Sequence, residues 1–223
     1  MEPIEIARLI DHTLLKPEAV PSQIERLCKE AREYNFATVC VNPVYVERAA
    51  ALLAESQVGV CGVIAFPLGA TTTAIKVAEA RQVLADGARE VDMVLHVGAL
   101  KAGDHARVQD DIAAVAAACH VGGALLKVIL ETALLNDEEK IAACRLAVAA
   151  GADFVKTSTG FSSAGATIED VQLMRRIVGP KVGVKAAGGI RTYADALAMI
   201  QAGANRIGAS ASVTIIEQAR AAT

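Results

Sequence analysis

The chain alternates short runs of β-branched and aliphatic residues with longer stretches of helical periodicity. Each short run is nearly continuous in Val, Ile and Leu, which is typical of parallel strands covered on both faces. No Pro-rich or Ser-rich linker interrupts this order, so we expect residues 1–223 to form a single domain. The pattern predicts eight strands, over residues 9–13, 36–41, 58–66, 89–96, 124–130, 153–159, 181–187 and 205–210.

Helical stretches fill the intervals between these strands. For the stretch 22–34 we expect Ser22 as the N-cap and Glu25 as its capping-box partner, and a helical turn should precede the first strand. Three strands follow a Gly-Ala pair, which predicts a repeated turn at the helix exit. The other expected helices cover residues 72–87, 109–122, 136–151, 167–179 and 193–203, with a last helix after residue 210.

Parallel strands that alternate with helices are compatible with an open doubly wound sheet or with a closed barrel. The open sheet usually carries a Gly-rich turn after its first strand, and neither G-x-G-x-x-G nor G-x-x-x-x-G-K-[ST] occurs in this chain. The strand count and the length favour an α/β fold, a single (β/α)8 TIM barrel with a short N-terminal helix.

Composition narrows the class of protein further. Lys and Arg number 22 against 25 Asp and Glu, a formal net charge of −3 that speaks against nucleic acid and against an anionic membrane surface as partners. The five cysteines have neither zinc-ligand nor redox spacing, and an odd number argues against a disulfide framework. The N-terminus does not resemble a signal peptide, and no apolar run is long enough to span a bilayer, so we expect a cytoplasmic protein.

Charged residues lie inside several of the expected strands, where a barrel should be apolar. They are Asp11, Asp92, Lys127, Lys156 and Lys185. An unpaired buried ion costs several kcal/mol. One buried lysine would fit a structural ion pair, but three lysines and two aspartates inside one barrel indicate a reaction centre.

The position of each lysine along its strand separates their roles. Lys156 and Lys185 come just before loops, near the carboxyl ends of their strands, where active sites of this fold lie. Neighbouring strands are about 4.8 Å apart, so two inward ammonium groups there would repel each other. Repulsion and burial both favour the neutral amine, the form that attacks a carbonyl group.

The remaining candidates keep two interpretations each. Lys127 lies deeper and is either an ion-paired core lysine or a supporting residue of the site, and Asp92 is a counter-ion of a lysine, a proton carrier, or both. Asp11 is left open in the same way. Cys40 either presents its thiol to the site or is a buried core residue. Because no histidine spacing suits a metal ion, we expect no metal site.

Glycines in three consecutive loops at the same end of the barrel predict a phosphate site. Glycine lets backbone N–H groups approach an anion, and the last two loops of this fold commonly hold a phosphate. Arg191 is a further candidate for the anion. The candidate phosphate-binding residues are Gly160, Gly188, Gly189, Gly208 and Ser210.

The motifs IDHTLLKP, VCVNP, VIAFPLG, EVDMV, LLKVILET, FVKTSTGF, VKAAGGIRT and RIGAS follow one another along the whole chain. In this order they resemble the deoxyribose-phosphate aldolases, a family of class I (Schiff-base) aldolases with a TIM-barrel fold. By position, Lys156 resembles the Schiff-base lysine, Lys185 the lysine that favours its free-amine form, and Asp92 the proton-transfer aspartate. The glycines and Ser210 match the phosphate loops of that family.

The resemblance implies reversible cleavage of 2-deoxy-D-ribose 5-phosphate into acetaldehyde and D-glyceraldehyde 3-phosphate, with a phosphosugar as the binding partner and no cofactor. We expect a homo-oligomer, a dimer or a tetramer. Two alternatives are a phosphosugar isomerase or synthase that uses the lysines as general acids, and a noncatalytic phosphosugar-binding barrel. The chain departs from some family members in two places: it ends Ala221-Ala222-Thr223 instead of in a tyrosine, and Phe161 replaces a lysine.

Overall fold

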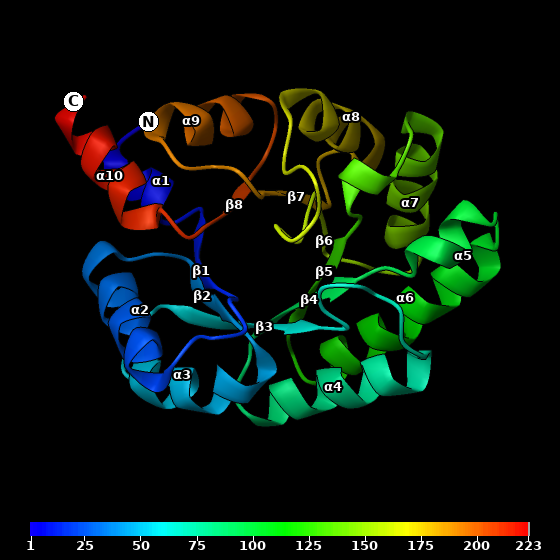
Figure 1. Cartoon of the computed structure of the whole chain (residues 1–223), viewed down its shortest axis with the longest axis horizontal. Helices are drawn as coiled ribbons and strands as arrows, with labels where there is room; N and C mark the ends of the chain where they lie inside the picture. The colour runs from blue at the N-terminus through cyan, green and yellow to red at the C-terminus, as the bar shows by residue number, and fades with distance from the viewer. Residues whose placement is uncertain (223) are drawn as a thin grey trace.

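The computed structural model describes residues 1–222, and Thr223, the last residue of the Ala-Ala-Thr tail, lies outside the described residues. Eight parallel strands form a closed barrel in which each strand pairs with the next and β8 pairs with β1 (Figure 1). This closure confirms the barrel and rules out the open sheet. The strands are β1 (Ile10–Leu14), β2 (Thr38–Val41), β3 (Gly59–Ile64), β4 (Glu90–Val94), β5 (Leu125–Ile129), β6 (Phe154–Lys156), β7 (Gly183–Ala187) and β8 (Arg206–Ala209).

A ring of helices surrounds the barrel, and the two ends of the described chain lie close together beside α1 and α10 (Figure 1). The short N-terminal helix expected from the sequence is α1. The helices are α1 (Pro3–Ala7), α2 (Pro21–Tyr34), α3 (Val46–Leu53), α4 (Thr73–Ala85), α5 (Val97–Lys101), α6 (His105–Val121), α7 (Asp137–Ala149), α8 (Ile168–Val178), α9 (Tyr193–Gln201) and α10 (Ser212–Ala221), with 3-10 turns η1 (Pro43–Tyr45) and η2 (Thr132–Leu134).

The start of α2 differs from the sequence prediction. The helix begins at Pro21 with Val20 as its N-cap, and the backbone N–H of Val20 donates a hydrogen bond to the Gln23 side chain at 3.0 Å. The capping box expected between Ser22 and Glu25 is therefore wrong. Proline suits the first helical position because its missing N–H has no partner to lose there.

The Gly-Ala turns are confirmed at three helix exits. Gly87, Gly151 and Gly203 have φ of 104°, 86° and 113°, values that favour glycine. In each case the following alanine N–H reaches back to a helix carbonyl, as Ala88 does to Val83 at 2.9 Å. The turn returns the chain from the outer ring to the amino end of the next strand.

The core is aliphatic and alanine-rich, and it surrounds a few fully buried charged side chains. One of these lies outside the barrel: Lys76 of α4 forms an ion pair with Asp111 of α6 at 2.6 Å and donates to the Val94 carbonyl at 2.9 Å. This pair links two helices to the end of β4. Among residues 1–222, no helix is long and apolar enough to cross a membrane.

Candidate active site

The strand register places the three lysines inside the barrel at two depths. Lys156 of β6 lies opposite Lys185 of β7, whereas Lys127 of β5 lies opposite Phe154, two residues before Lys156. All three lysines are buried. Since side chains alternate along a strand, the lysines share the inward face, and Lys127 lies one layer deeper, as the sequence predicted.

Asp92 of β4 is the carboxylate that all three lysines share. Its Oδ2 accepts hydrogen bonds from the Nζ atoms of Lys156 and Lys185, both at 2.8 Å. Its Oδ1 accepts one from Lys127 Nζ, also at 2.8 Å. Asp92 is therefore a counter-ion, one of the two interpretations that the sequence allowed.

A second group of charges lies against this carboxylate. Asp11 of β1 forms an ion pair with Lys185 at 2.5 Å, and Glu90 of β4 forms one with Lys127 at 2.5 Å. Arg206 of β8 contacts both carboxylates, Asp11 at 2.7 Å and Glu90 at 2.8 Å. The interior of the barrel thus holds one continuous network of ion pairs.

The protonation states of this network follow from its contacts. Burial by itself would raise the pKa of Asp92, but the three ammonium groups outweigh it and hold that pKa well below its usual range. Burial acts to lower the pKa of Lys185, but the carboxylates of Asp11 and Asp92 raise it above that of an ordinary lysine. The expectation that burial and repulsion favour a neutral amine is therefore wrong for Lys185, because carboxylates lie between the amines.

A cavity of about 470 Å³ opens at the carboxyl ends of the strands. Of the three lysines in the barrel, only Lys156 lines it. A groove of about 570 Å³ lies against α7 and α8, but none of the residues of the ion-pair network lines it. The cavity at the mouth of the barrel is therefore the candidate site for a small molecule.

The structure brings the five candidate phosphate residues together around this cavity. Those residues are Gly160, Gly188, Gly189, Gly208 and Ser210. The loop after β7 packs closely against the loop after β6. A Cβ on Gly165 would lie 2.2 Å from the Gly188 carbonyl oxygen, so position 165 has no room for a side chain. At Gly189, φ is 82° and nothing lies within 4 Å of the Cβ position, so its backbone is open to the cavity.

Two cationic side chains line the cavity as well. They are Arg191, a candidate from the sequence, and Lys16 from the loop after β1, which the sequence reasoning did not single out. The nearest carboxylate to Lys16 is Glu18 at 4.0 Å, so its ammonium group is weakly paired. Phe161 lies at the rim, half exposed, with its ring edge-on to Phe66 at 5.4 Å between centroids.

Glu131, the second residue after β5, is buried. Its carboxylate accepts hydrogen bonds from the hydroxyl and the backbone N–H of Thr159. The contact fixes the loop that leads from Lys156 to Gly160.

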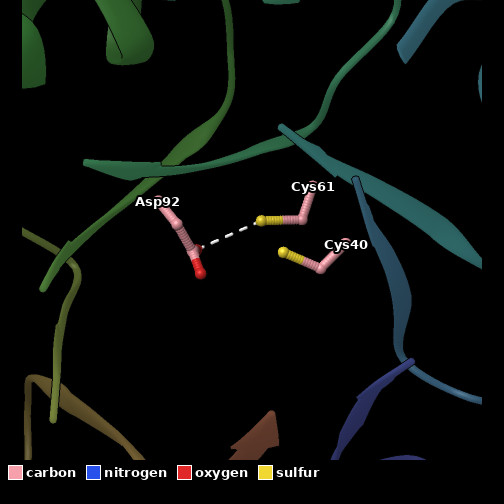
Figure 2. A group of neighbouring side chains, drawn as sticks. All are labelled: Cys40, Cys61 and Asp92. Atoms are coloured by element: carbon pink, nitrogen blue, oxygen red, sulfur yellow. Dashed lines mark hydrogen bonds between the residues drawn. The ribbon is translucent and has the colours of Figure 1, made fainter. Parts of the chain in front are cut away.

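Three residues of the interior were missed by the sequence reasoning: Glu90, Arg206 and Cys61. A signal for two of them was present, because Glu90 lies two residues before Asp92 and Arg206 two residues before Gly208, on the same face of their strands. Cys61 of β3 donates a hydrogen bond to Asp92 at 3.1 Å. Cys40 is fully buried, as one interpretation held, but it also faces the interior beside Cys61 (Figure 2).

The closed parallel barrel, with a buried lysine–carboxylate network below a cavity at its mouth, places the chain among the (β/α)8-barrel enzymes. A family model described as DeoC/LacD family aldolase matches residues 6–215, so the chain belongs to that family. It is therefore an aldolase, a carbon–carbon lyase.

Known relatives agree with this family over nearly the whole chain. Deoxyribose-phosphate aldolase 1 of Bacillus licheniformis is 62% identical over 213 residues, which cover 96% of this chain and 95% of the relative. The deoxyribose-phosphate aldolase of Thermococcus gammatolerans is 59% identical and covers 97% of each chain. Among solved structures, a tetrameric deoxyribose phosphate aldolase from Aeropyrum pernix superposes with a TM-score of 0.93 at 35% identity, over all of this chain and 94% of its own.

Proposed function

We propose that the chain, acting as one catalytic domain over residues 1–223, reversibly cleaves 2-deoxy-D-ribose 5-phosphate into acetaldehyde and D-glyceraldehyde 3-phosphate. The reaction proceeds through a Schiff base on Lys156. The names of the relatives suggest the substrate class. The observation that carries the assignment of the nucleophile is that Lys156 is the one lysine of the barrel network that reaches the cavity.

The count of charges supports the same lysine. With every group ionised, the network holds four cations (Lys127, Lys156, Lys185, Arg206) against three carboxylates (Asp11, Glu90, Asp92). A buried excess charge is costly, so loss of one proton from an amine is favoured. Lys127 contacts three of the carboxylates and Lys185 contacts two, but Lys156 contacts Asp92 alone, so Lys156 is the amine with the fewest ion pairs to lose.

The free amine of Lys156 attacks the aldehyde carbon of the substrate, and loss of water gives the imine. When the carbon–carbon bond breaks, its electron pair moves into the protonated imine, which acts as the electron sink. D-Glyceraldehyde 3-phosphate leaves first. Protonation of the remaining enamine and hydrolysis of the imine release acetaldehyde and restore the amine.

Asp92 carries protons in these steps. In the resting network its carboxylate is ionised, because three ammonium groups lower its pKa. Once Lys156 has become neutral, Asp92 has one cation fewer beside it, and its affinity for a proton rises. The same side chain can then accept the proton of the substrate hydroxyl that becomes the aldehyde as the carbon–carbon bond breaks, and return a proton to the enamine carbon at a later step. Lys185 remains positively charged and holds Asp92 in place at 2.8 Å.

The substrate phosphate binds at the glycine loops around Gly160, Gly188–Gly189 and Gly208, with Ser210 as a further hydrogen-bond donor. Lys16 and Arg191 line the same cavity as Lys156. They supply the positive charge that a lysine at position 161 supplies in some relatives. The loops after β1 and β7 thus provide the cations that the neutral ring of Phe161 does not.

The phosphate site predicts a strong preference for phosphorylated substrate. Unphosphorylated deoxyribose should react far more slowly, because binding energy at the phosphate positions the reacting carbons. In steady-state assays of acetaldehyde release, G189D should lower kcat/KM for the phosphorylated sugar alone, through steric block and like-charge repulsion, and K16A should raise its KM. The matched control is G123D. Gly123 is exposed, its φ is 69° and nothing lies within 4 Å of its Cβ position, and it lies before β5, at the end of that strand away from the cavity. Equal losses on both sugars would contradict this placement.

We also propose that the reaction needs no metal or organic cofactor. Both oxygens of Asp92 already accept hydrogen bonds from ammonium groups, which leaves that carboxylate poorly suited to a cation. We expect full turnover after exhaustive treatment with a chelator, measured against an untreated sample. A loss of activity that added zinc restores would establish a metal-dependent mechanism instead.

Two further properties complete the proposal. We infer a homo-oligomer, a dimer or a tetramer, supported by the tetrameric relative and by exposed apolar side chains such as Val44 and Val121. Light scattering of the purified protein measures the assembly.

A reducing cytoplasm suits the five cysteines, which are all buried free thiols. Cell fractionation tests this location.

A further inference from the structure

Two thiols lie side by side at the centre of the barrel. Cys40 of β2 and Cys61 of β3 are directly opposed on neighbouring strands, and both are fully buried. Their sulfur atoms and an oxygen of Asp92 all lie within 4.8 Å of one another (Figure 2). Neighbouring strands are about 4.8 Å apart, which is inside the range of about 4.4–6.8 Å that disulfides span between Cα atoms. The two thiols are therefore placed to form a bond with little movement of the backbone.

The two cysteines differ from the other three in their electrostatics. Burial raises the pKa of Cys28 to about 11 and those of Cys119 and Cys144 to about 12. The pKa of Cys40 is instead lowered, first by its hydrogen-bonding contact with the Cys61 thiol and then by nearby ammonium groups. Burial raises that of Cys61. A thiol whose pKa is lowered, next to one whose pKa is raised, is the arrangement of an oxidant-sensitive cysteine and its resolving partner.

The cavity comes close to this pair at Leu15, although neither cysteine lines the cavity itself. Leu15 packs against the two cysteines and also lines the cavity, next to Lys156. The amine of Lys156 must itself be reached by an aldehyde although its side chain is only 3% exposed. Hydrogen peroxide is smaller than acetaldehyde, so an opening that admits the substrate also admits peroxide.

The same three side chains could be considered as metal ligands, but their surroundings oppose it. Asp92 is already bound by three ammonium groups, and Lys127 Nζ lies 3.4 Å from the Cys61 sulfur. A divalent cation at this point would lie among these positive charges. The pair is better suited to redox chemistry than to metal binding.

We propose that Cys40 and Cys61 form a disulfide when the protein meets hydrogen peroxide, and that this bond reversibly inactivates the aldolase. The loss of activity rests on the proposed function, whereas the disulfide itself does not.

The chemistry needs only peroxide as the oxidant. The Cys40 thiolate attacks one peroxide oxygen, the O–O bond breaks, and hydroxide leaves, which converts Cys40 to a sulfenic acid. The Cys61 sulfur then displaces the sulfenic oxygen, which leaves as water, and the S–S bond forms. In total, two thiols lose two electrons and two protons, and one peroxide is reduced to two waters.

The disulfide acts on the reaction through Asp92. In the reduced protein, Cys61 donates a hydrogen bond to Asp92 Oδ1. In the disulfide, the Cys61 sulfur has no proton left to donate. The Cys61 sulfur must also move towards Cys40 to form the bond. Because Asp92 Oδ2 contacts both Lys156 and Lys185, a displaced carboxylate disturbs the nucleophile and its cationic neighbour together.

The test treats the purified protein with hydrogen peroxide, blocks the remaining thiols, and maps peptides by mass spectrometry. A linked Cys40–Cys61 peptide should accumulate in proportion to the loss of acetaldehyde-releasing activity, and dithiothreitol should reverse both. Each variant is compared with its own untreated activity. C144S, which removes a buried thiol of α7, should behave as the wild type.

In C61S the linked peptide should be absent, and prolonged treatment should instead leave Cys40 as a sulfinic acid that dithiothreitol does not restore. The proposal is overturned if treated wild type contains no linked peptide, or if C61S loses and regains activity as the wild type does. Because the peptide is read by mass, a linked peptide in a protein without aldolase activity would refute the proposed function and leave the disulfide established.

Discussion

Replacing Lys156 with alanine should abolish both turnover and covalent labelling. Borohydride added with acetaldehyde should reduce the imine of the wild type and leave one two-carbon unit on Lys156, located by peptide mass spectrometry. In K156A neither the label nor acetaldehyde release should remain, a loss of about 10⁴-fold or more in kcat, as is typical when a covalent nucleophile is removed.

The charges of the barrel provide the control for this experiment. Without Lys156, three cations face three carboxylates, and Asp92 keeps its hydrogen bonds from Lys127 and Lys185. The variant should therefore fold with a melting temperature close to that of the wild type, so that lost activity cannot be ascribed to unfolding. Labelling found on Lys127 or Lys185 in the wild type would refute the assignment of the nucleophile.

The sequence was sufficient to predict the barrel, because the barrel depends on local patterns. Runs of Val, Ile and Leu, Gly-Ala exits such as Gly87-Ala88 and cap residues such as Asn136 are properties of neighbouring positions. The start of α2 was predicted two residues late, with the N-cap at Ser22 instead of Val20, because Ser22 and Glu25 match a capping box while Pro21 equally suits a first helical position. Local signals of similar strength cannot be ranked without the packing around them.

The site was predictable in its members but not in its contacts. Strand ends identified Lys156 and Lys185, but not that Asp92 lies between their amines, from a strand two places away from β6 and three from β7. Which ions pair across a barrel depends on tilt and register, which no local pattern encodes. For the same reason Cys61 was missed, because its partner Asp92 lies on another strand. Arg206 did carry a signal, its place two residues before Gly208 on the same face of β8.

The charge network gives a different reason for expecting turnover to depend on Lys185: its positive charge, not a direct repulsion between two amines. Its own pKa is raised by Asp11 and Asp92, so it is positively charged throughout the neutral range. With Lys185 present, the network carries one positive charge too many unless Lys156 is neutral. When Lys185 is replaced by leucine, three carboxylates face Lys127, Arg206 and a protonated Lys156, and the network is balanced only when Lys156 keeps its proton.

We therefore expect K185L to lose most turnover at neutral pH and to recover part of it in alkali. A lysine with the ordinary pKa of about 10.4 is a free amine in only about one molecule in 10³ at neutral pH, and each pH unit gained below that pKa multiplies the free amine by about ten. Borohydride trapping with acetaldehyde, measured from neutral to alkaline pH, reports imine formation without the later steps. The trapping curve of K185L should move to higher pH, in the direction expected when a cation is lost.

The matched variant K185R keeps the positive charge at this position and separates charge from chemistry. If charge is what matters, K185R should trap acetaldehyde at neutral pH much as the wild type does, although its larger head group alters the contacts with Asp11 and Asp92. Leucine also increases burial of the neighbouring amine, which opposes the shift, so a displaced curve in K185L is a conservative result. An unchanged trapping curve in K185L together with lost turnover would refute the charge-balance role and show that Lys185 serves a later step, as a proton donor or a substrate-binding group.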